Sequence, residues 1–160
     1  MEPKVTNKEE ILVVGIATTT NNEKELSNTG EISKLWSRFY TEEIFHVIIN
    51  QAAPTEVLGV YTQYTTGASG DYLMLIGQQV SNTNQTDDKL VQIKIPASKY
   101  LVFTSKQGPV AQVVPETWNM IWQWFEEHDS KRAFTGDFEL YDERGKNPEQ
   151  AIVDIYISIK

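Results

Sequence analysis

Short runs of β-branched and aromatic residues, separated by polar turn clusters, recur along the whole chain. This pattern is typical of β-strands. The runs predict strands at residues 11–20, 56–64, 72–80, 90–95, 100–105, 137–142 and 151–159. The second and third strands are separated by a GASGD cluster at 67–71, so together they predict a hairpin.

Two segments follow helical spacing instead. Residues 31–43 predict an amphipathic helix with Thr29 as its N-cap. A second helix is expected to begin at Pro115, because the first helical position needs no amide hydrogen, and to end near His128. The polar segment 21–30 predicts a loop. The apolar stripes of the two helices are Ile32, Leu35, Trp36 and Phe39, and Trp118, Ile121, Trp122 and Phe125.

The two stripes match each other at a constant offset of 86 residues. Each predicted helix also follows one strand and precedes two, so the order strand–helix–strand–strand occurs twice. We therefore expect a single α+β domain over residues 1–160, made of duplicated β-α-β-β units at approximately 10–80 and 90–160. Two antiparallel sheets, each with one main helix, would enclose a central ligand cleft. An ordinary α+β order without duplication would give the same sequence of elements.

Composition excludes several kinds of site. The chain has no cysteine, which removes disulfides, thiolate metal sites and cysteine nucleophiles. Its two histidines, His46 and His128, are isolated rather than clustered, so we expect no metal site and no cofactor. The formal net charge is −8, from 22 acidic and 14 basic residues. Because there is no basic patch large enough for a duplex, we expect no direct binding of nucleic acid.

The distribution of apolar residues also bears on where the protein works. Residues 1–10 are polar and charged and lack the apolar core of a signal peptide. No run approaches the roughly 18 apolar residues of a membrane helix. We therefore expect a cytoplasmic protein that does not enter the membrane.

Seven short stretches of the sequence indicate a family resemblance. Each is short and mostly apolar, so their order and spacing are more specific than any single stretch. The stretches are 35–39 (LWSRF), 59–64 (GVYTQY), 70–77 (GDYLMLIG), 95–100 (IPASKY), 118–125 (WNMIWQWF), 138–141 (FELY) and 153–157 (VDIYI). In this respect the chain resembles the GyrI-like family, which provides the effector-binding domains of AraC- and MerR-type regulators and also includes stand-alone, integron-cassette-like proteins. The resemblance implies a duplicated βαββ fold with a central pocket. About ten residues precede the first expected strand, too few for a helix-turn-helix domain, so the stand-alone type is expected.

The resemblance also implies an acidic residue among aromatic side chains, on the strand after the second helix, that receives cationic and lipophilic ligands. By motif position this residue is Glu139. A ligand cation would offset the cost of burying the carboxylate, and aromatic faces would add roughly 0.5–2 kcal/mol each. Strand alternation alone favours another arrangement, in which Phe138 and Leu140 face inward while Glu139 and Tyr141 face water. The candidate ligand-binding aromatic residues are Tyr61, Trp36, Trp122, Tyr72, Phe39, Tyr141 and Tyr156, with Tyr64 as a further candidate wall.

The leading hypothesis is therefore a small-molecule-binding domain for cationic, lipophilic compounds, with a role in transcriptional regulation or drug sensing and with a regulator or a second copy as its protein partner. A second hypothesis is a small-molecule hydrolase in which Glu139 is the general base. No second acid pairs reliably with Glu139, although Glu56 and Asp154 flank neighbouring strands. A third is a gyrase-inhibitor-like protein-interaction module, against which the scattered placement of the acidic residues counts.

Overall fold

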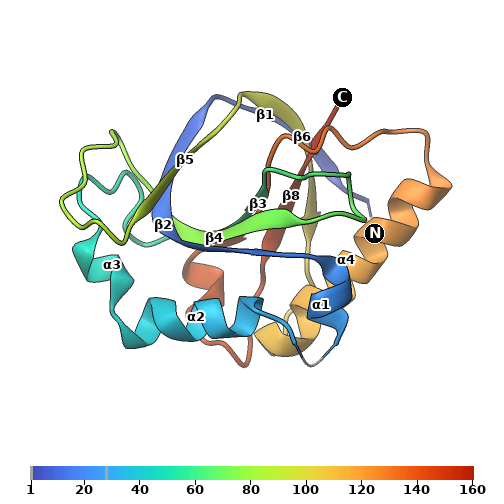
Figure 1. The fold of residues 1–160 in the computed structure, drawn as a ribbon. Helices are drawn as coiled ribbons and strands as arrows, with labels where there is room; N and C mark the ends of the chain where they lie inside the picture. Colours follow the sequence, from blue (N-terminus) through green and yellow to red (C-terminus); the bar gives the residue numbers. More distant parts are fainter. Residues whose placement is uncertain (1, 28) are drawn as a thin grey trace.

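Eight strands form one antiparallel sheet in the computed structural model, which describes residues 2–27 and 29–160. The strands are β1 (Lys4–Lys8), β2 (Ile11–Thr20), β3 (Val57–Thr62), β4 (Tyr72–Gln79), β5 (Val91–Ile95), β6 (Ser98–Thr104), β7 (Asp137–Tyr141) and β8 (Asp154–Ile159). The helices are α1 (Asn22–Leu26), α2 (Ile32–Thr41), α3 (Ile44–Val47), α4 (Val110–Glu127) and the short 3-10 helix η1 (Glu143–Gly145). Figure 1 shows α1, α2 and α4 together on one side of the central strands, whereas β1, β5 and β6 arch over the other side.

Each half of the chain contributes a contiguous set of three strands to the sheet. The sheet runs β1-β6-β8-β7-β3-β4-β2-β5, so β3 and β7 pair at its centre and each is followed outward by the other two strands of its own half. The outermost strands are exchanged, because β1 pairs with β6 and β5 pairs with β2. The expected antiparallel α+β fold is confirmed, but the expectation of two separate sheets is wrong, because β3 pairs with β7 and joins the halves into one continuous sheet. That the halves arose by duplication stays a prediction.

Apolar side chains are buried on both faces of this sheet. On the helix side, α2 and α3 cover β2 and β4, and α4 covers β6 and β8. A separate cluster lies on the other face, beneath the arching edge strands. Because successive residues of a strand point to opposite faces, β7 buries Phe138 in that cluster and turns Glu139 toward α4. The arrangement in which Glu139 faces water is therefore wrong, as only 2% of this residue is exposed.

Helix α4 begins earlier than the sequence prediction. Its first residue is Val110 and its N-cap is Pro109, whereas Pro115 lies inside the helix. The amide of Val113 already donates to the carbonyl of Pro109 at 2.9 Å, so helical hydrogen bonding begins before Pro115. Pro115 cannot form the hydrogen bond of its own amide, and a proline ring inside a helix also crowds the carbonyl four residues earlier. Among the described residues, neither α4 nor any other helix is both long and apolar enough to cross a membrane.

Helix α2 is capped from a distance. Its N-cap position is Glu31 rather than the expected Thr29, and the side chain of Glu31 makes no capping hydrogen bond. The carboxylate of Glu25 caps the helix instead, accepting the amides of Glu31 at 2.8 Å and Ile32 at 3.1 Å. A negative charge at a helix N-terminus is favourable because the first amides lack partners within the helix. Glu25 thereby fixes α1 against the start of α2.

Four described elements have no counterpart in the sequence prediction: β1, α1, α3 and η1. Strand β1 presents mostly exposed side chains, with Val5 59% exposed, and it is held by its pairing with β6. Helix α1 lies within the segment expected to be a loop, and Asn21 caps it by accepting the amide of Lys24 at 2.8 Å. Asparagine is a preferred N-cap residue. Together, α1 and α2 form one side of the space above the centre of the sheet.

Candidate functional site

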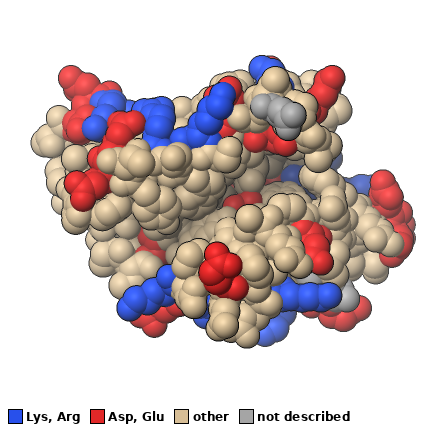
Figure 2. All heavy atoms as spheres, turned by 90° about the horizontal axis from the view of Figure 1, so that it is seen from below, with Lys and Arg blue, Asp and Glu red and all other residues tan. Residues whose placement is uncertain are grey.

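A cavity of about 910 Å³ lies between α1 and α2 on one side and α4 on the other. Its floor is formed by β3, β4 and β7, and the space-filling view from the helix side shows the surface hollowed between the two halves (Figure 2). This volume is near the upper end of the range of roughly 300–1,000 Å³ for small-molecule sites. The two halves of the sheet therefore enclose a cavity where the sequence predicts a ligand cleft.

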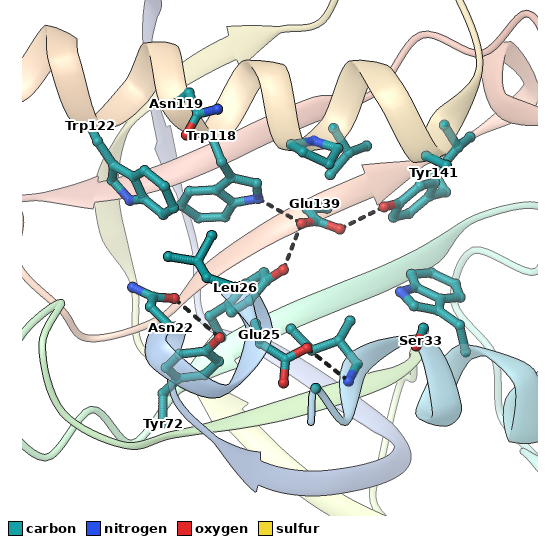
Figure 3. A pocket seen from close by; sticks show the side chains of 18 of the residues that line it. Asn22, Glu25, Leu26, Ser33, Tyr72, Trp118, Asn119, Trp122, Glu139 and Tyr141 are labelled. Carbon is teal, nitrogen blue, oxygen red and sulfur yellow. Dashed lines mark hydrogen bonds between the residues drawn. The ribbon is translucent and has the colours of Figure 1, made fainter. Parts of the chain in front are cut away.

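Glu139 projects from β7 into this cavity (Figure 3). Its Oε2 accepts the hydroxyl of Tyr61 at 2.7 Å and the indole N–H of Trp118 at 2.8 Å. Its Oε1 accepts the hydroxyl of Tyr141 at 2.6 Å. In the described part of the chain, no lysine or arginine lies within ion-pair distance of this carboxylate. Glu139 is thus a buried carboxylate held by three neutral donors and lacking a counter-charge.

Burial sets the protonation behaviour of this group. It raises the pKa of the Glu139 carboxyl above its ordinary value, and the hydrogen bonds from Tyr141, Trp118 and Tyr61 offset part of that rise. Burial, followed by the negative charge of Glu139, raises the pKa of Tyr61 and of Tyr141 well above the usual value. Both tyrosines therefore stay protonated and act as hydrogen-bond donors at neutral pH.

The room for this carboxylate comes from a glycine. Gly59 on β3 pairs directly with Glu139 on β7. A Cβ at position 59 would lie 3.2 Å from Oε1 of Glu139, 3.2 Å from Cε of Met74 and 3.5 Å from Cζ2 of Trp36. Gly59 was not among the residues predicted to form the site. An isolated glycine within a strand run is nevertheless the kind of signal that marks a close approach of neighbouring atoms.

Aromatic side chains form the walls around Glu139. Tyr61 meets Trp118 edge to face, with ring centroids 5.1 Å apart, and Trp36 meets Tyr141 in the same way at 4.9 Å. Most of this lining was predicted from the sequence, but Trp118, a member of the α4 stripe, was ranked below Trp36 and Trp122 and is not among the predicted site residues. Of the eight predicted site residues, the structure brings together in the cavity lining Glu139, Tyr61, Trp36, Trp122, Tyr72 and Tyr141.

Two predicted residues lie elsewhere. Phe39 follows Trp36 by one helical turn but points into the core between α2 and the sheet, where it is fully buried. Tyr156 on β8 lies on the sheet face opposite the helices and stacks on Phe138, with ring centroids 4.5 Å apart and planes inclined by 12°. Alternation along β8 places Ile155 and Ile157 toward α4, so Tyr156 points away from the cavity. Neither Phe39 nor Tyr156 lines the cavity.

A buried ion pair supports one end of the cavity. Arg132 lines the cavity, and its Nη2 lies 2.7 Å from Oδ2 of Asp137, with side-chain exposures of 9% and 0%. Tyr64, which also lines the cavity, donates to the same oxygen at 2.5 Å, and Ser158 donates to Oδ1 through both its amide and its hydroxyl. This pair was not predicted from the sequence. The spacing of Asp137 and Glu139 by two residues places both on one face of β7 and is a signal that could have found it.

The other acids considered from the sequence do not reach Glu139. Glu56 and Asp154 are absent from the cavity lining. Asp154 pairs with Arg144 at 2.6 Å and accepts the hydroxyl of Thr104 at 2.6 Å. A different carboxylate, that of Glu25 on α1, does line the cavity. Among the described residues, no group of three or more His, Cys, Asp or Glu side chains is arranged to hold a metal ion.

Comparison with known proteins gives consistent results. The chain is 32% identical over 146 residues to YobU of Bacillus subtilis (strain 168), whose name describes it as a transcriptional regulator, and this covers 91% of the chain and 90% of YobU. The crystal structure of integron cassette protein VCH_CASS2, from the mobile metagenome of Vibrio cholerae, has a TM-score of 0.77 and 27% identity, covering 99% and 96% of the two chains. The structure of SAV2435 bound to tetraphenylphosphonium has a TM-score of 0.82 and 22% identity, covering 100% and 94%.

A family profile covers nearly the entire chain. Residues 4–159 match the family described as integron-associated effector binding proteins. The match includes both halves of the sheet, both main helices and every element that lines the cavity. The resemblance inferred from the seven sequence stretches is thus confirmed: this chain belongs to the integron-associated effector binding proteins, a GyrI-like family.

Proposed function

We propose that the cavity is an effector site for lipophilic cations and that Glu139 supplies the counter-charge. The observation that carries this proposal is a carboxylate only 2% exposed whose hydrogen-bond donors are all neutral. A buried charge without an opposite charge is costly, and a ligand cation beside it would offset that cost. The likeness to SAV2435, whose structure holds the lipophilic cation tetraphenylphosphonium, supports the same ligand class for this chain.

The walls of the cavity suit such ligands. Trp36, Trp118 and Trp122 provide large apolar surfaces, and a cation over such a ring gains roughly 0.5–2 kcal/mol. Tyr61 and Tyr141 direct their hydroxyl groups at Glu139, which leaves their ring surfaces for contact with the ligand. Neither the ring surfaces nor the charge of Glu139 imposes a strict ligand shape. The site should therefore accept apolar cations of a range of shapes.

We place this binding in the control of transcription. YobU, which matches nearly the whole chain, is described as a transcriptional regulator, and the family is defined by effector binding. Occupation of the cavity would connect α1 and α2 with α4, because the ligand would contact both walls. A ligand that binds one arrangement of these walls more tightly than another shifts the protein toward that arrangement.

Binding is favoured over hydrolysis by the hydrogen bonds of Glu139. A general base must accept a proton from a positioned water. Two carboxylate oxygens offer about four acceptor positions, and three are already used by Tyr61, Trp118 and Tyr141. No second carboxylate is hydrogen-bonded to Glu139 in the described residues. This arrangement is better suited to holding a negative charge in place than to transferring protons.

The test compares one cation and one neutral ligand on matched variants. Tetraphenylphosphonium and neutral triphenylphosphine oxide are titrated into the wild type, Glu139→Gln and the control Glu56→Gln, with tryptophan fluorescence as the readout. We expect Glu139→Gln to weaken binding of the cation at least about tenfold, since a contact with a charged group is lost. Glu56→Gln and the neutral ligand should show little change. Equal affinity of the wild type and Glu139→Gln for the cation would contradict the proposal.

A further inference from the structure

A second carboxylate lies in the same cavity. Figure 3 shows Glu139 below α4 and Glu25 on the side of α1 and α2. Oε2 of Glu25 accepts the hydroxyl of Thr20 at 2.6 Å and the amide of Glu31 at 2.8 Å, and its Oε1 accepts the amide of Ile32 at 3.1 Å. These contacts fix the carboxylate in the wall opposite Glu139.

The two carboxylates accept hydrogen bonds from the same kind of donor, although Glu139 is buried and Glu25 is partly exposed. Glu25, like Glu139, is held by three neutral donors, and in the part of the chain that the structure describes it forms no ion pair with lysine or arginine. A carboxylate offers about four acceptor positions. One position therefore remains on Glu25 and one on Glu139, and each can accept an N–H group of a bound cation.

The rest of the lining does not neutralise these charges. The charged residues that line the cavity are Glu25, Glu139, Glu149 and Arg132. Arg132 is the one cation among these described residues, and its charge is already paired with the fully buried Asp137. The cavity as a whole thus carries an excess of negative charge. One monovalent cation would compensate only part of it.

The hydroxyl of Tyr72 is affected by the negative charges of both carboxylates. Burial, followed by the charges of Glu25 and Glu139, raises the pKa of the Tyr72 hydroxyl. The rings of Tyr72 and Tyr61 lie with centroids 5.4 Å apart, and Tyr61 reaches Glu139 directly. Aromatic surface therefore lies between the two acids, where an apolar or aromatic spacer would pack.

We propose that the cavity selects dicationic ligands, in which an apolar spacer joins two positive groups, with one group at Glu139 and the other at Glu25. The first half of this arrangement rests on the proposed function, because Glu139 is shared. The second half is a specificity subsite on α1. Ligands with planar N–H groups, such as amidinium ions, suit both ends because they donate hydrogen bonds as well as carrying charge.

The test compares a ligand that carries two positive groups with a related ligand that carries one. Pentamidine carries two benzamidinium groups, and para-pentyloxybenzamidine carries one such group on a similar apolar chain. Both are titrated by calorimetry into the wild type, Glu139→Gln, Glu25→Gln and Glu149→Gln. Glu149 is the matched control, since it also lines the cavity and its replacement removes the same charge. Glutamine at position 25 keeps an oxygen that can cap α2, and thermal unfolding checks that the variant is folded.

We expect Glu25→Gln to weaken pentamidine about tenfold or more while the monocation changes less than about twofold, because only the dication reaches this acid. Glu149→Gln should change pentamidine much less. Equal losses in Glu25→Gln and Glu149→Gln, or equal losses of both ligands in Glu25→Gln, would overturn the second subsite and leave the role of Glu139 intact. Failure of both ligands to bind the wild type would instead contradict the proposed function.

A crystal structure of the wild type with pentamidine tests the subsite without any variant. One amidinium should lie at Glu139 and the other at Glu25. A second amidinium in solvent, or one at Glu149, would overturn the assignment.

Discussion

Gly59 lies directly opposite Glu139 where β3 pairs with β7, so the acid stands beside the one residue type that has no side chain. This pair lies at the centre of the sheet, where the two halves of the chain meet. The fold thus places a buried charge at the junction of its halves, with α2 on one side and α4 on the other.

Gly59→Ala should lower ligand affinity. The added Cβ would stand 3.2 Å from Oε1 of Glu139, and that oxygen cannot shift without weakening its bond with Tyr141. Overpacking of this kind costs about 1–3 kcal/mol. We expect weaker binding of tetraphenylphosphonium and a lower unfolding temperature. Gly145→Ala is the control, because its Cβ would meet only Cδ1 of Tyr141, at 3.9 Å. Similar behaviour of both variants would refute the crowding argument.

Binding of a permanent cation should depend on pH. In the proposed function a cation binds ionised Glu139, and burial raises the pKa of this carboxyl above its ordinary value. Affinity for tetraphenylphosphonium should therefore fall as pH is lowered from about 7 to about 4, with a midpoint above that of an ordinary glutamate. The Kd of Glu139→Gln should stay nearly constant over the same range. A wild-type affinity that does not vary with pH would show that ionisation of Glu139 is not coupled to binding.

Glu139→Gln should be at least as stable as the wild type at neutral pH. A glutamine oxygen in place of Oε2 keeps the bonds from Tyr61 and Trp118, and its NH₂ can donate to Tyr141 if that hydroxyl turns to accept. Because the pKa of Glu139 is raised in the folded state, its ionisation destabilises the fold as pH rises through that pKa. Chemical denaturation should show the advantage of glutamine at neutral pH and its loss at acidic pH. A variant less stable than the wild type at neutral pH would contradict this prediction.

Most of the strands and helices that bury apolar side chains were predictable from the sequence, but the short helix α3, which buries Ile44, was not. Hydrophobic periodicity reports burial, and it located β2 and the stripes of α2 and α4. Hydrophobic periodicity does not indicate β1, because this strand is held by backbone pairing with β6 while Val5 stays exposed. Hydrophobic periodicity does not indicate α1 either, because α1 is a short polar helix that is capped locally by Asn21.

The site was predictable only in part, because it depends on which sheet face is covered. The prediction from alternation along β7 assumes that one face of the sheet is exposed to solvent. Both faces are buried here, so Glu139 was identified by family resemblance rather than by periodicity. Phe39 and Trp36 share one helical stripe, and the sequence does not tell which of them the cavity reaches. Glu25 caps α2 through the amides of Glu31 and Ile32. A single contact of this kind produces no hydrophobic periodicity, so it could not be predicted from the sequence.

The ion pair of Arg132 with Asp137 should contribute more to stability than the two more exposed ion pairs of Arg144. Arg132→Met leaves the carboxylate of Asp137, which is 0% exposed, without its counter-charge, and such a loss costs about 3–5 kcal/mol. Arg144→Met is the control, because Arg144 is 40% exposed and its partners Asp142 and Asp154 are 25% and 14% exposed, so water can solvate the remaining charges and the loss should be smaller. Urea denaturation measures both. Adding Asp137→Asn to Arg132→Met removes the unpaired charge and should recover part of the stability. Equal losses in the two single variants, or no recovery in the double variant, would show that packing rather than charge determines the effect.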